Sequence, residues 1–401
     1  MRCYWHVASV VALASALTLS ASRGAFAQTP AEFEGTQISG WTFTPGVIVS
    51  TIFDNNVALA AEFPTRPETQ GDQLLLIEPF GQFEFHGPRT TFESSYRGYL
   101  RRYMDLDELN GFDQRGQVSI RHRATRHLTL FLNNAYMKVP TTDELELNGV
   151  LFARTGSRTN TLGGGMESRL SKYMDLNVRY DLTWVDFKRV NTLLRSGFTN
   201  GVRAELARRL SDRSALGAEY AIRFATLDAG SRNLTFQDVG ATFRYDTGPH
   251  TSLDAAAGVS HLIDQSTNIT HTGPYVRIGI THQMERATVG ASFSRSLLPT
   301  FGFGGSSQSE AFHGFVRMPI TRNRMYVQQS VSWRRSNPLD PTILALDSWW
   351  LRSTMGYAVS RWVRLEGFYA YTRQDSRVPG GLVNRQRVGV QFVFAQPMRI
   401  Q

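Results

Sequence analysis

Short segments in which every second residue is apolar recur along this chain. In the clearest one, 176–184, Leu, Val, Tyr, Leu and Trp alternate with polar or charged residues. Segments 216–224 and 363–371 repeat the alternation. Because side chains of a β-strand point alternately to its two faces, each segment predicts a strand with one apolar and one polar face. No helical period of 3.6 residues persists beyond the first thirty or so positions.

Tight turns and longer loops alternate between about eighteen such segments, giving a repeat of about 40 residues. The tight turns are predicted at 87–89, 125–127, 171–173, 211–213, 247–250, 284–286, 321–323 and 360–362. The longer loops are predicted near 54–72, 105–112, 139–158, 189–197, 228–233, 264–271, 298–308, 335–346 and 375–383. We therefore predict an all-β fold, a transmembrane antiparallel up-and-down β-barrel of about 16–18 strands, with short periplasmic turns and longer extracellular loops.

A soluble β-sandwich also alternates, with its apolar faces forming the core, so alternation alone leaves both folds open. The start of the chain favours the membrane barrel. Residues 1–27 have the pattern of a secretory signal peptide, with a short apolar stretch and the cleavage motif Ala25-Phe26-Ala27. That stretch is shorter than the roughly 20 apolar residues of a spanning helix. We expect a short periplasmic segment at 28–40 and a barrel of the bacterial outer membrane at 41–394.

The last predicted strand, 387–394, ends in two aromatic residues. Its alternation places Val388, Val390, Phe392 and Phe394 on one face and Arg387, Gly389, Gln391 and Val393 on the other. This strand resembles the C-terminal signal of bacterial outer-membrane barrels, which implies recognition by the barrel-assembly machinery. The signal residues are Arg387, Gly389, Phe392 and Phe394. Such signals usually end on the aromatic, whereas residues 395–401 follow here and are expected to form a tail beyond the strand.

The first predicted hairpin carries a second recognisable pattern. Pro45-Gly46 open a strand that ends in Phe53-Asp54-Asn55-Asn56-Val57, and Asp72 and Glu78-Pro79 follow after the loop. This resembles the β-barrel porin 2 family of bacterial outer-membrane proteins, and later hairpins share that family's Ser/Thr-basic-x turns. The resemblance covers essentially the whole chain after the signal peptide and implies an outer-membrane barrel, but little about its cargo. The Asp54-Asn55-Asn56 trio is interpreted as a polar turn, with a calcium site as the alternative.

Composition and motifs narrow the chemistry. The formal net charge is +9, but export and the absence of a clustered basic run argue against nucleic acid as a partner. Cys3 lies in the signal peptide, so the exported chain is expected to contain no thiol, disulfide or thiolate metal site. His122, His261 and His313 lack the partner spacing of a hydrolase. Gly163-Gly164-Gly165 lies in a predicted strand and no helix follows, so it is no phosphate loop. We predict no enzymatic activity and no cofactor or metal.

Arginines inside predicted strands are the distinctive chemical feature. A guanidinium facing lipid costs about 2–4 kcal/mol at the bilayer midplane, so arginines of the polar register should face the barrel interior. The predicted pore-lining residues are Arg179, Arg223, Arg277, Arg352, Arg364 and Arg387. Asp181, Glu219 and Glu366 share that register. Two interpretations follow: an ion-pair network that holds the barrel's shape, or a basic track that draws anions inward.

Barrels of this size usually enclose an aqueous channel. The leading hypothesis is a porin-like outer-membrane channel for polar, mainly anionic, solutes. The alternatives are a conduit for acidic surface polysaccharide, a closed structural or adhesive barrel, and a barrel enzyme. The expected partners are outer-membrane lipid, the barrel-assembly machinery, and small anionic solutes or acidic polysaccharide. The acidic loop 139–158, which carries Glu144, either folds inward as a constriction or lies at the surface.

Overall fold

The computed structural model describes most of the chain from residue 40 onward. The described residues are 40–57, 71–140, 156–187, 194–227, 231–248, 250–302, 304–321, 324–341, 343–376 and 381–400. The predicted signal peptide 1–27, Cys3, positions 28–39 and loop positions 141–155 lie outside them. In the described part of the chain no helix is long and apolar enough to cross a membrane.

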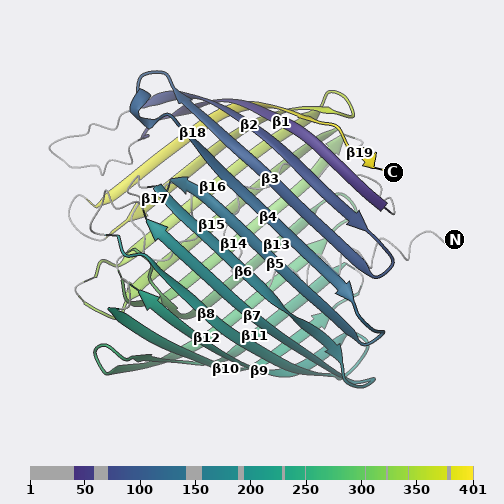
Figure 1. Ribbon diagram of the computed structural model, residues 1–401, viewed down its shortest axis with the longest axis vertical. Coiled ribbons are helices and arrows are strands. Elements are labelled where there is room, and N and C mark those ends of the chain that lie inside the picture. The colour runs from purple at the N-terminus through teal and green to yellow at the C-terminus, as the bar shows by residue number, and fades with distance from the viewer. Residues whose placement is uncertain are drawn as a thin grey trace.

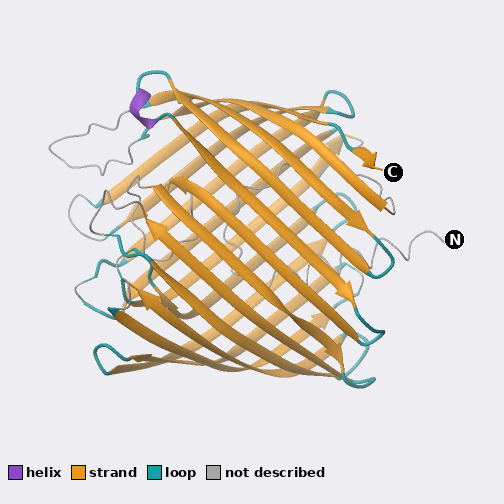
Figure 2. Ribbon diagram, viewed as in Figure 1, coloured by secondary structure: helices purple, strands orange, loops and turns teal. Residues whose placement is uncertain are grey.

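Long antiparallel strands make up nearly all of the described structure (Figure 2). They are β1 (Gly40–Asp54), β2 (Asp72–His86), β3 (Thr90–Tyr103), β4 (Gly111–Arg123), β5 (Leu128–Pro140), β6 (Gly156–Arg169), β7 (Met174–Phe187), β8 (Gly197–Arg209), β9 (Ser214–Leu227), β10 (Arg232–Asp246), β11 (Thr251–Asp264), β12 (Ile269–Gln283), β13 (Thr288–Pro299), β14 (Ser306–Thr321), β15 (Met325–Pro338), β16 (Leu346–Ala358), β17 (Val363–Asp375) and β18 (Leu382–Ala395). A short strand, β19 (Met398–Ile400), and one 3₁₀ turn, η1 (Asp107–Leu109), complete the described elements.

The sheet closes on itself. Each strand from β1 to β17 pairs with the next one along the chain, and β18 pairs with β1 from Gly46 opposite Ala395 to Asp54 opposite Arg387. In Figure 1 the strands run obliquely between two rims, as closure of a barrel requires. The predicted all-β up-and-down barrel is therefore confirmed, at the upper end of the predicted range of strand number.

The connections also follow the prediction. The eight predicted tight turns all fall between consecutive strands at one end of the barrel, which we name the short-turn rim. The nine predicted longer loops fall at the other end, the long-loop rim. Sequence periodicity located these connections because each one interrupts the alternation of apolar and polar positions.

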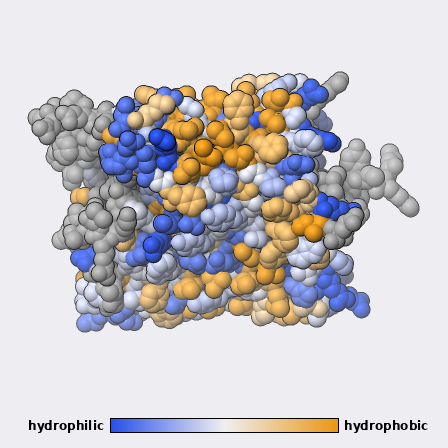
Figure 3. Space-filling view, turned by 45° about the horizontal axis from the view of Figure 1, so that its top comes forward, coloured by the Kyte–Doolittle hydropathy of each residue, from blue (hydrophilic) through white to orange (hydrophobic). Residues whose placement is uncertain are grey.

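The alternation sorts side chains between the two faces of the wall. In β7, Tyr180 and Trp184 are exposed on the outside, while Val185 and Phe187 of the other register are buried. Figure 3 shows hydrophobic residues over much of the strand surface, with hydrophilic residues gathered towards the two ends. This inside-out distribution is the reverse of a soluble protein and matches a barrel whose outer face contacts lipid.

The closing strand extends further than its sequence pattern indicated. β19 pairs with β1 from Trp41 opposite Ile400 to Phe43 opposite Met398, and this keeps the register of the β1–β18 pairing. Gln396 donates its backbone N–H to the carbonyl of Pro45, 3.1 Å away. Residues 398–400 therefore belong to the barrel wall rather than to a tail beyond it. Pro397, which has no N–H to donate, interrupts the strand between its two parts.

Candidate pore lining

The six arginines singled out from the sequence all occupy the register that faces the barrel interior. Their direct neighbours in the same strands, such as Tyr180 beside Arg179 and Phe224 beside Arg223, point outwards and are exposed. Val388 likewise flanks Arg387 on the outer face. The pleat of the strand therefore turns each of these guanidinium groups away from the apolar surface.

Four of these arginines form ion pairs with carboxylates of the same interior register. The nitrogen–oxygen distances are 2.7 Å for Arg179–Asp181, 3.0 Å for Arg223–Asp238, 3.3 Å for Arg277–Glu219 and 3.6 Å for Arg364–Glu366. Arg352 places its guanidinium over the Phe368 ring, 4.8 Å from the centroid. Arg387 lies opposite Ala370 of β17. The three carboxylates noted in the sequence, Asp181, Glu219 and Glu366, are thus all partners of predicted arginines.

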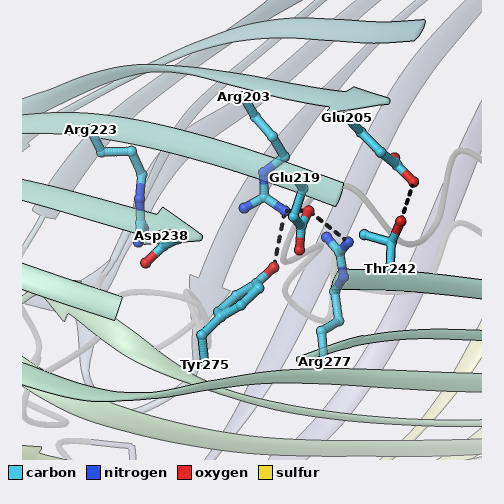
Figure 4. A network of polar contacts seen from close by, with 8 residues as sticks. All are labelled: Arg203, Glu205, Glu219, Arg223, Asp238, Thr242, Tyr275 and Arg277. Atoms are coloured by element: carbon cyan, nitrogen blue, oxygen red, sulfur yellow. Dashed lines mark hydrogen bonds and ion pairs between the residues drawn. The ribbon is translucent and has the colours of Figure 1, made fainter. Parts of the chain in front are cut away.

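A buried carboxylate, Glu219, lies between two arginines on the inner face of β8–β12 (Figure 4). Arg203 and Arg277 approach it to 3.4 and 3.3 Å. The Tyr275 hydroxyl accepts a hydrogen bond from Arg203 at 3.3 Å. The Tyr275 ring passes 3.4 Å from the point where Gly240 would carry a Cβ, which is ordinary van der Waals contact. The network fixes both guanidinium groups in the interior.

A second network surrounds Glu78 of β2. Arg97 approaches Glu78 to 3.4 Å, and the positive charges of Arg115 and Arg352 also act on this carboxylate. The Arg115 guanidinium lies over the Tyr99 ring, 5.4 Å from its centroid. Positive charge therefore exceeds negative charge around Glu78, where three arginines meet Glu78 and Glu366. Around Glu219 the two arginines are more nearly balanced, because Asp238 also acts on Arg203.

Sequence reasoning missed Arg97, Arg115 and Arg203. All three lie in the interior register of their strands, and Arg203 is directly opposite Arg179 in the ladder. The signal was available, because each one alternates with outward residues such as Tyr96, Phe112 and Val202. Their strands contain fewer large apolar residues, which made the period-2 pattern harder to recognise.

The wall is incompletely paired between β12 and β13. Their ladder ends at Val276 opposite Arg295, so Ile269–Tyr275 of β12 has no strand partner on that side among the described residues. β13 instead continues with β14 as far as Pro299 opposite Ser306. We call the segment formed by 296–302 and 304–309 the β13–β14 tip.

The β13–β14 tip lies inside the barrel. Leu297 belongs to the outward register of β13 but is fully buried. It packs with interior residues of β7, β9, β10 and β11 in one apolar cluster, together with Phe301 of the tip. The cluster comprises Val185, Phe187, Ala225, Leu227, Leu234, Phe236, Leu262, Leu297 and Phe301. The departure of β13 from β12 thus carries an outer-face leucine onto the inner wall.

Polar contacts hold the tip in place. Gly302 and Arg195 exchange two backbone hydrogen bonds, of 2.5 and 3.0 Å, which join the tip to the connection between β7 and β8. Arg223 donates to the carbonyl oxygen of Leu297 at 3.1 Å, and Arg232 to that of Gly304 at 3.4 Å. The tip is therefore fixed against the inner wall of β7–β11 near the long-loop rim.

The Asp54-Asn55-Asn56 trio closes the seam between the first and last strands. The buried Asp54 carboxylate accepts two hydrogen bonds from Arg385 of β18, of 2.8 and 2.5 Å. Asn56 donates to the carbonyl oxygen of Asn384 at 2.9 Å, and Asn55 accepts from the backbone of Gln386 at 2.7 Å. These contacts tie the motif to the last strand. Among the described residues, no three or more His, Cys, Asp or Glu side chains lie together so that they could hold a metal ion.

Histidines and strand glycines have structural settings. Four imidazoles hydrogen-bond to hydroxyl groups directly opposite in the ladder, at 2.7–2.8 Å: His122–Thr90, His261–Thr272, His282–Thr251 and His313–Ser332. The repetition of one cross-strand geometry indicates paired wall residues rather than a nucleophile with its base. Gly163, Gly164 and Gly165 lie in the regular ladder of β6.

The residues of the proposed assembly signal divide between the two faces. Phe392 and Phe394 are exposed on the outer surface beside Val388 and Val390. Gly389 faces the interior, where the Phe368 ring lies closer than a Cβ would allow. Glu144 and the rest of 141–155 lie outside the described residues, so the two interpretations of that loop stay open.

No family model matches the sequence, and no curated protein matches it. Solved outer-membrane proteins resemble it in structure. OccAB4 of Acinetobacter baumannii gives a TM-score of 0.47 at 10% identity, over 90% of this chain and 99% of that one. OpdK of Pseudomonas aeruginosa gives 0.45 at 9% identity, over 89% and 99%. OccAB2 of A. baumannii gives 0.45 at 12% identity, over 90% and 100%. Likeness at this level does not extend to function. The assignment of the barrel fold is based on the strand pairing within this chain.

Proposed function

We propose that this chain forms a channel of the bacterial outer membrane that passes small polar solutes and prefers anions. The observation that carries the proposal is the arrangement of charge. The outer face of the wall is apolar, whereas on the inner face three arginines lie around Glu78 and two contact Glu219. A polar lining inside an apolar wall is the arrangement of a water-filled pore.

The orientation follows from the two rims. Barrels of this class have short periplasmic turns and longer extracellular loops, so the short-turn rim would lie in the periplasm and the long-loop rim outside the cell. Export would depend on the signal peptide at 1–27. The closing strand, with Arg387, Gly389, Phe392 and Phe394, would be read by the barrel-assembly machinery. The resemblance to the β-barrel porin 2 family implies the same placement, but no family model matches the chain and the membership stays a prediction.

The interior arginines would act on an anion electrostatically. Most of them are held by a carboxylate or an aromatic ring, so their charge is fixed in position before a solute arrives. Fixed positive charge against a low-dielectric wall raises the local concentration of anions and repels cations. Because most guanidinium groups already share a carboxylate, each site would bind an anion weakly and release it readily, as conduction requires. The β13–β14 tip would set the narrowest region.

A closed structural or adhesive barrel is the second candidate. The same observations favour it in part, because ion pairs such as Arg179–Asp181 stiffen a wall and the β13–β14 tip packs inside the barrel. A conduit for acidic surface polysaccharide would use the same arginines as the leading proposal. It differs in the size of its cargo.

Solute uptake into proteoliposomes separates these functions. Labelled gluconate and labelled glucosamine are similar in size and opposite in charge. An anion-preferring channel should admit gluconate faster than glucosamine, and empty liposomes should admit neither. A closed barrel would leave both solutes outside, although the protein runs as a folded, heat-modifiable band.

A further inference from the structure

Exposed cations line the short-turn rim. Seven of its turns carry one in the described residues: Arg89, Arg126, Lys172, Arg213, Arg286, Arg324 and Arg361. The carboxylates of the described turn residues are Asp212 and Glu285. The long-loop rim differs in sign, because its described connections carry Asp105, Asp107, Glu108 and Asp340 against Arg195. Among the described turn and loop residues, net positive charge is therefore found at the short-turn rim.

Local hydrogen bonding fixes the direction of several of these cations. In four turns a Ser or Thr oxygen accepts the backbone N–H two residues further on. The donors are His127 to Thr125 at 3.1 Å, Tyr173 to Ser171, Arg213 to Ser211 and Trp362 to Ser360, the last three at 3.2 Å. This turn places the intervening residue at the apex. In three of the four turns that residue is Arg126, Lys172 or Arg361.

The depth of these cations relative to a bilayer follows from their apolar neighbours. Leu170, Leu210, Met284 and Val359 directly precede turns, and each is 51–59% exposed. Large apolar side chains so exposed are unfavourable in water, so the hydrocarbon region must reach almost to the turns. Cations one to three residues further along then lie at the level of the lipid head groups.

Two of the cations also contact interfacial aromatic rings. The Lys172 ammonium lies 5.4 Å from the centroid of Tyr173, and the Arg361 guanidinium lies 4.3 Å from that of Trp362. Aromatic side chains of this kind settle at the boundary between hydrocarbon and head groups. The contacts keep both charges beside that boundary instead of extending them into water.

We propose that the short-turn rim binds anionic phospholipids of the leaflet that surrounds it, through the lipid phosphate groups. The proposal rests on the barrel being a membrane protein, but not on its lumen being open. A soluble acidic polymer of the cell wall would also meet positive charge here. The position of the cations beside exposed Leu170 and Val359 favours lipid, because it places them at head-group depth.

Native mass spectrometry of the folded barrel in detergent tests this, with phosphatidylglycerol and phosphatidylcholine of identical acyl chains as probes. The unmutated protein should retain more phosphatidylglycerol. The variant R126Q/K172Q/R361Q should lose about a hundredfold in apparent affinity, since each cation near an anionic surface contributes about fivefold. The control R102Q/R158Q/R373Q removes three exposed arginines of the outer face beside the long-loop rim, of which Arg373 lies 4.0 Å from Asp375. It should retain the phosphatidylglycerol that the short-turn rim binds.

Equal retention of phosphatidylglycerol by both triple variants would overturn the proposal. So would a rim that shows no lipid preference but binds soluble muropeptides through the same three cations. If the rim variant does not fold, the proposal is tested instead by the salt dependence of the lipid preference of the unmutated protein. The preference must shrink as the screening length falls from about 10 Å at 0.1 M to about 3 Å at 1 M. Failure to insert into phosphatidylcholine vesicles would contradict the membrane barrel itself, whereas insertion without lipid preference contradicts only lipid binding at the short-turn rim.

Discussion

Release of the β13–β14 tip should widen the channel. Leu297 is fully buried in the interior cluster, so Leu297→Ala removes its packing at a cost of about 2–5 kcal/mol. The barrel ladder does not depend on this side chain, because Ser296–Pro299 pairs with β14 and not with β12. The loss therefore falls mainly on the docking of the tip.

The remaining attachments of the tip are modest. The two Arg195–Gly302 backbone bonds and the bonds from Arg223 and Arg232 contribute about 0.5–3 kcal/mol each. Burial of Phe301 adds about 1.5–3 kcal/mol. Loss of Leu297 packing thus removes a substantial part of the docking free energy. It should shift the balance between docked and released tip by about 30-fold or more, since 1.4 kcal/mol corresponds to tenfold.

Single-channel recording in a planar bilayer measures the effect. The L297A channel should show larger or more frequently open conductance levels than the unmutated protein. Leu74→Ala serves as the matched control, because Leu74 is a buried leucine of the other interior cluster and does not contact the tip. L74A should lower the temperature of heat modification but leave conductance unchanged. An L297A channel with unaltered conductance and open-state noise, in a folded barrel, would refute the constriction by the tip.

Three further outcomes are expected. Replacing four interior arginines by glutamine should move the ion preference of the channel towards cations, because Asp181, Asp238 and Glu366 then lack their arginine partners. Reversal potentials measure this preference. An unchanged preference would identify the arginines as wall supports. The four are Arg179, Arg223, Arg352 and Arg364. Asp54→Asn should destabilise the barrel by about 3–5 kcal/mol, because Arg385 stays buried without its carboxylate. Asp175→Asn, at the partly exposed pair with Arg209, should cost under about 1 kcal/mol. Urea titration of the heat-modifiable band compares the two variants, and equal midpoints would contradict the seam. Phe392→Ala with Phe394→Ala should leave the chain unassembled in the periplasm, and a normal yield in membrane extracts would count against the assembly signal.

Much of the fold follows from the sequence because a β-strand has a side-chain period of two. The alternation around Tyr180 and Trp184 gave both the strand and the direction of Arg179, since a one-residue slip would turn every side chain to the other face. Ion pairing between side chains of the lining was also predictable in outline. Asp181 lies two positions from Arg179 on the same face, where a contact needs no knowledge of distant strands.

Features that depend on distant segments were not predictable. Leu297 sits in the lipid-facing register, and only the packing of the tip on β9–β11 explains its burial. Pro274, in the unpaired part of β12, was the available signal, because proline within a strand marks an edge. Pro397 had the opposite effect. It suggested that the last strand had ended, whereas Met398–Ile400 resumes the pairing with β1. The Asp54–Arg385 ion pair joins the first and last strands, a contact that local sequence cannot reveal.

The reversal potential of the purified, unmutated barrel tests the central claim most directly. The protein is inserted into a planar bilayer that separates two KCl solutions of different concentration. The excess of fixed positive charge around Glu78 predicts a reversal potential displaced towards the equilibrium potential of chloride, with a displacement that falls as total salt rises. A reversal potential displaced towards that of potassium, or a folded and inserted barrel that carries no current, would contradict the account.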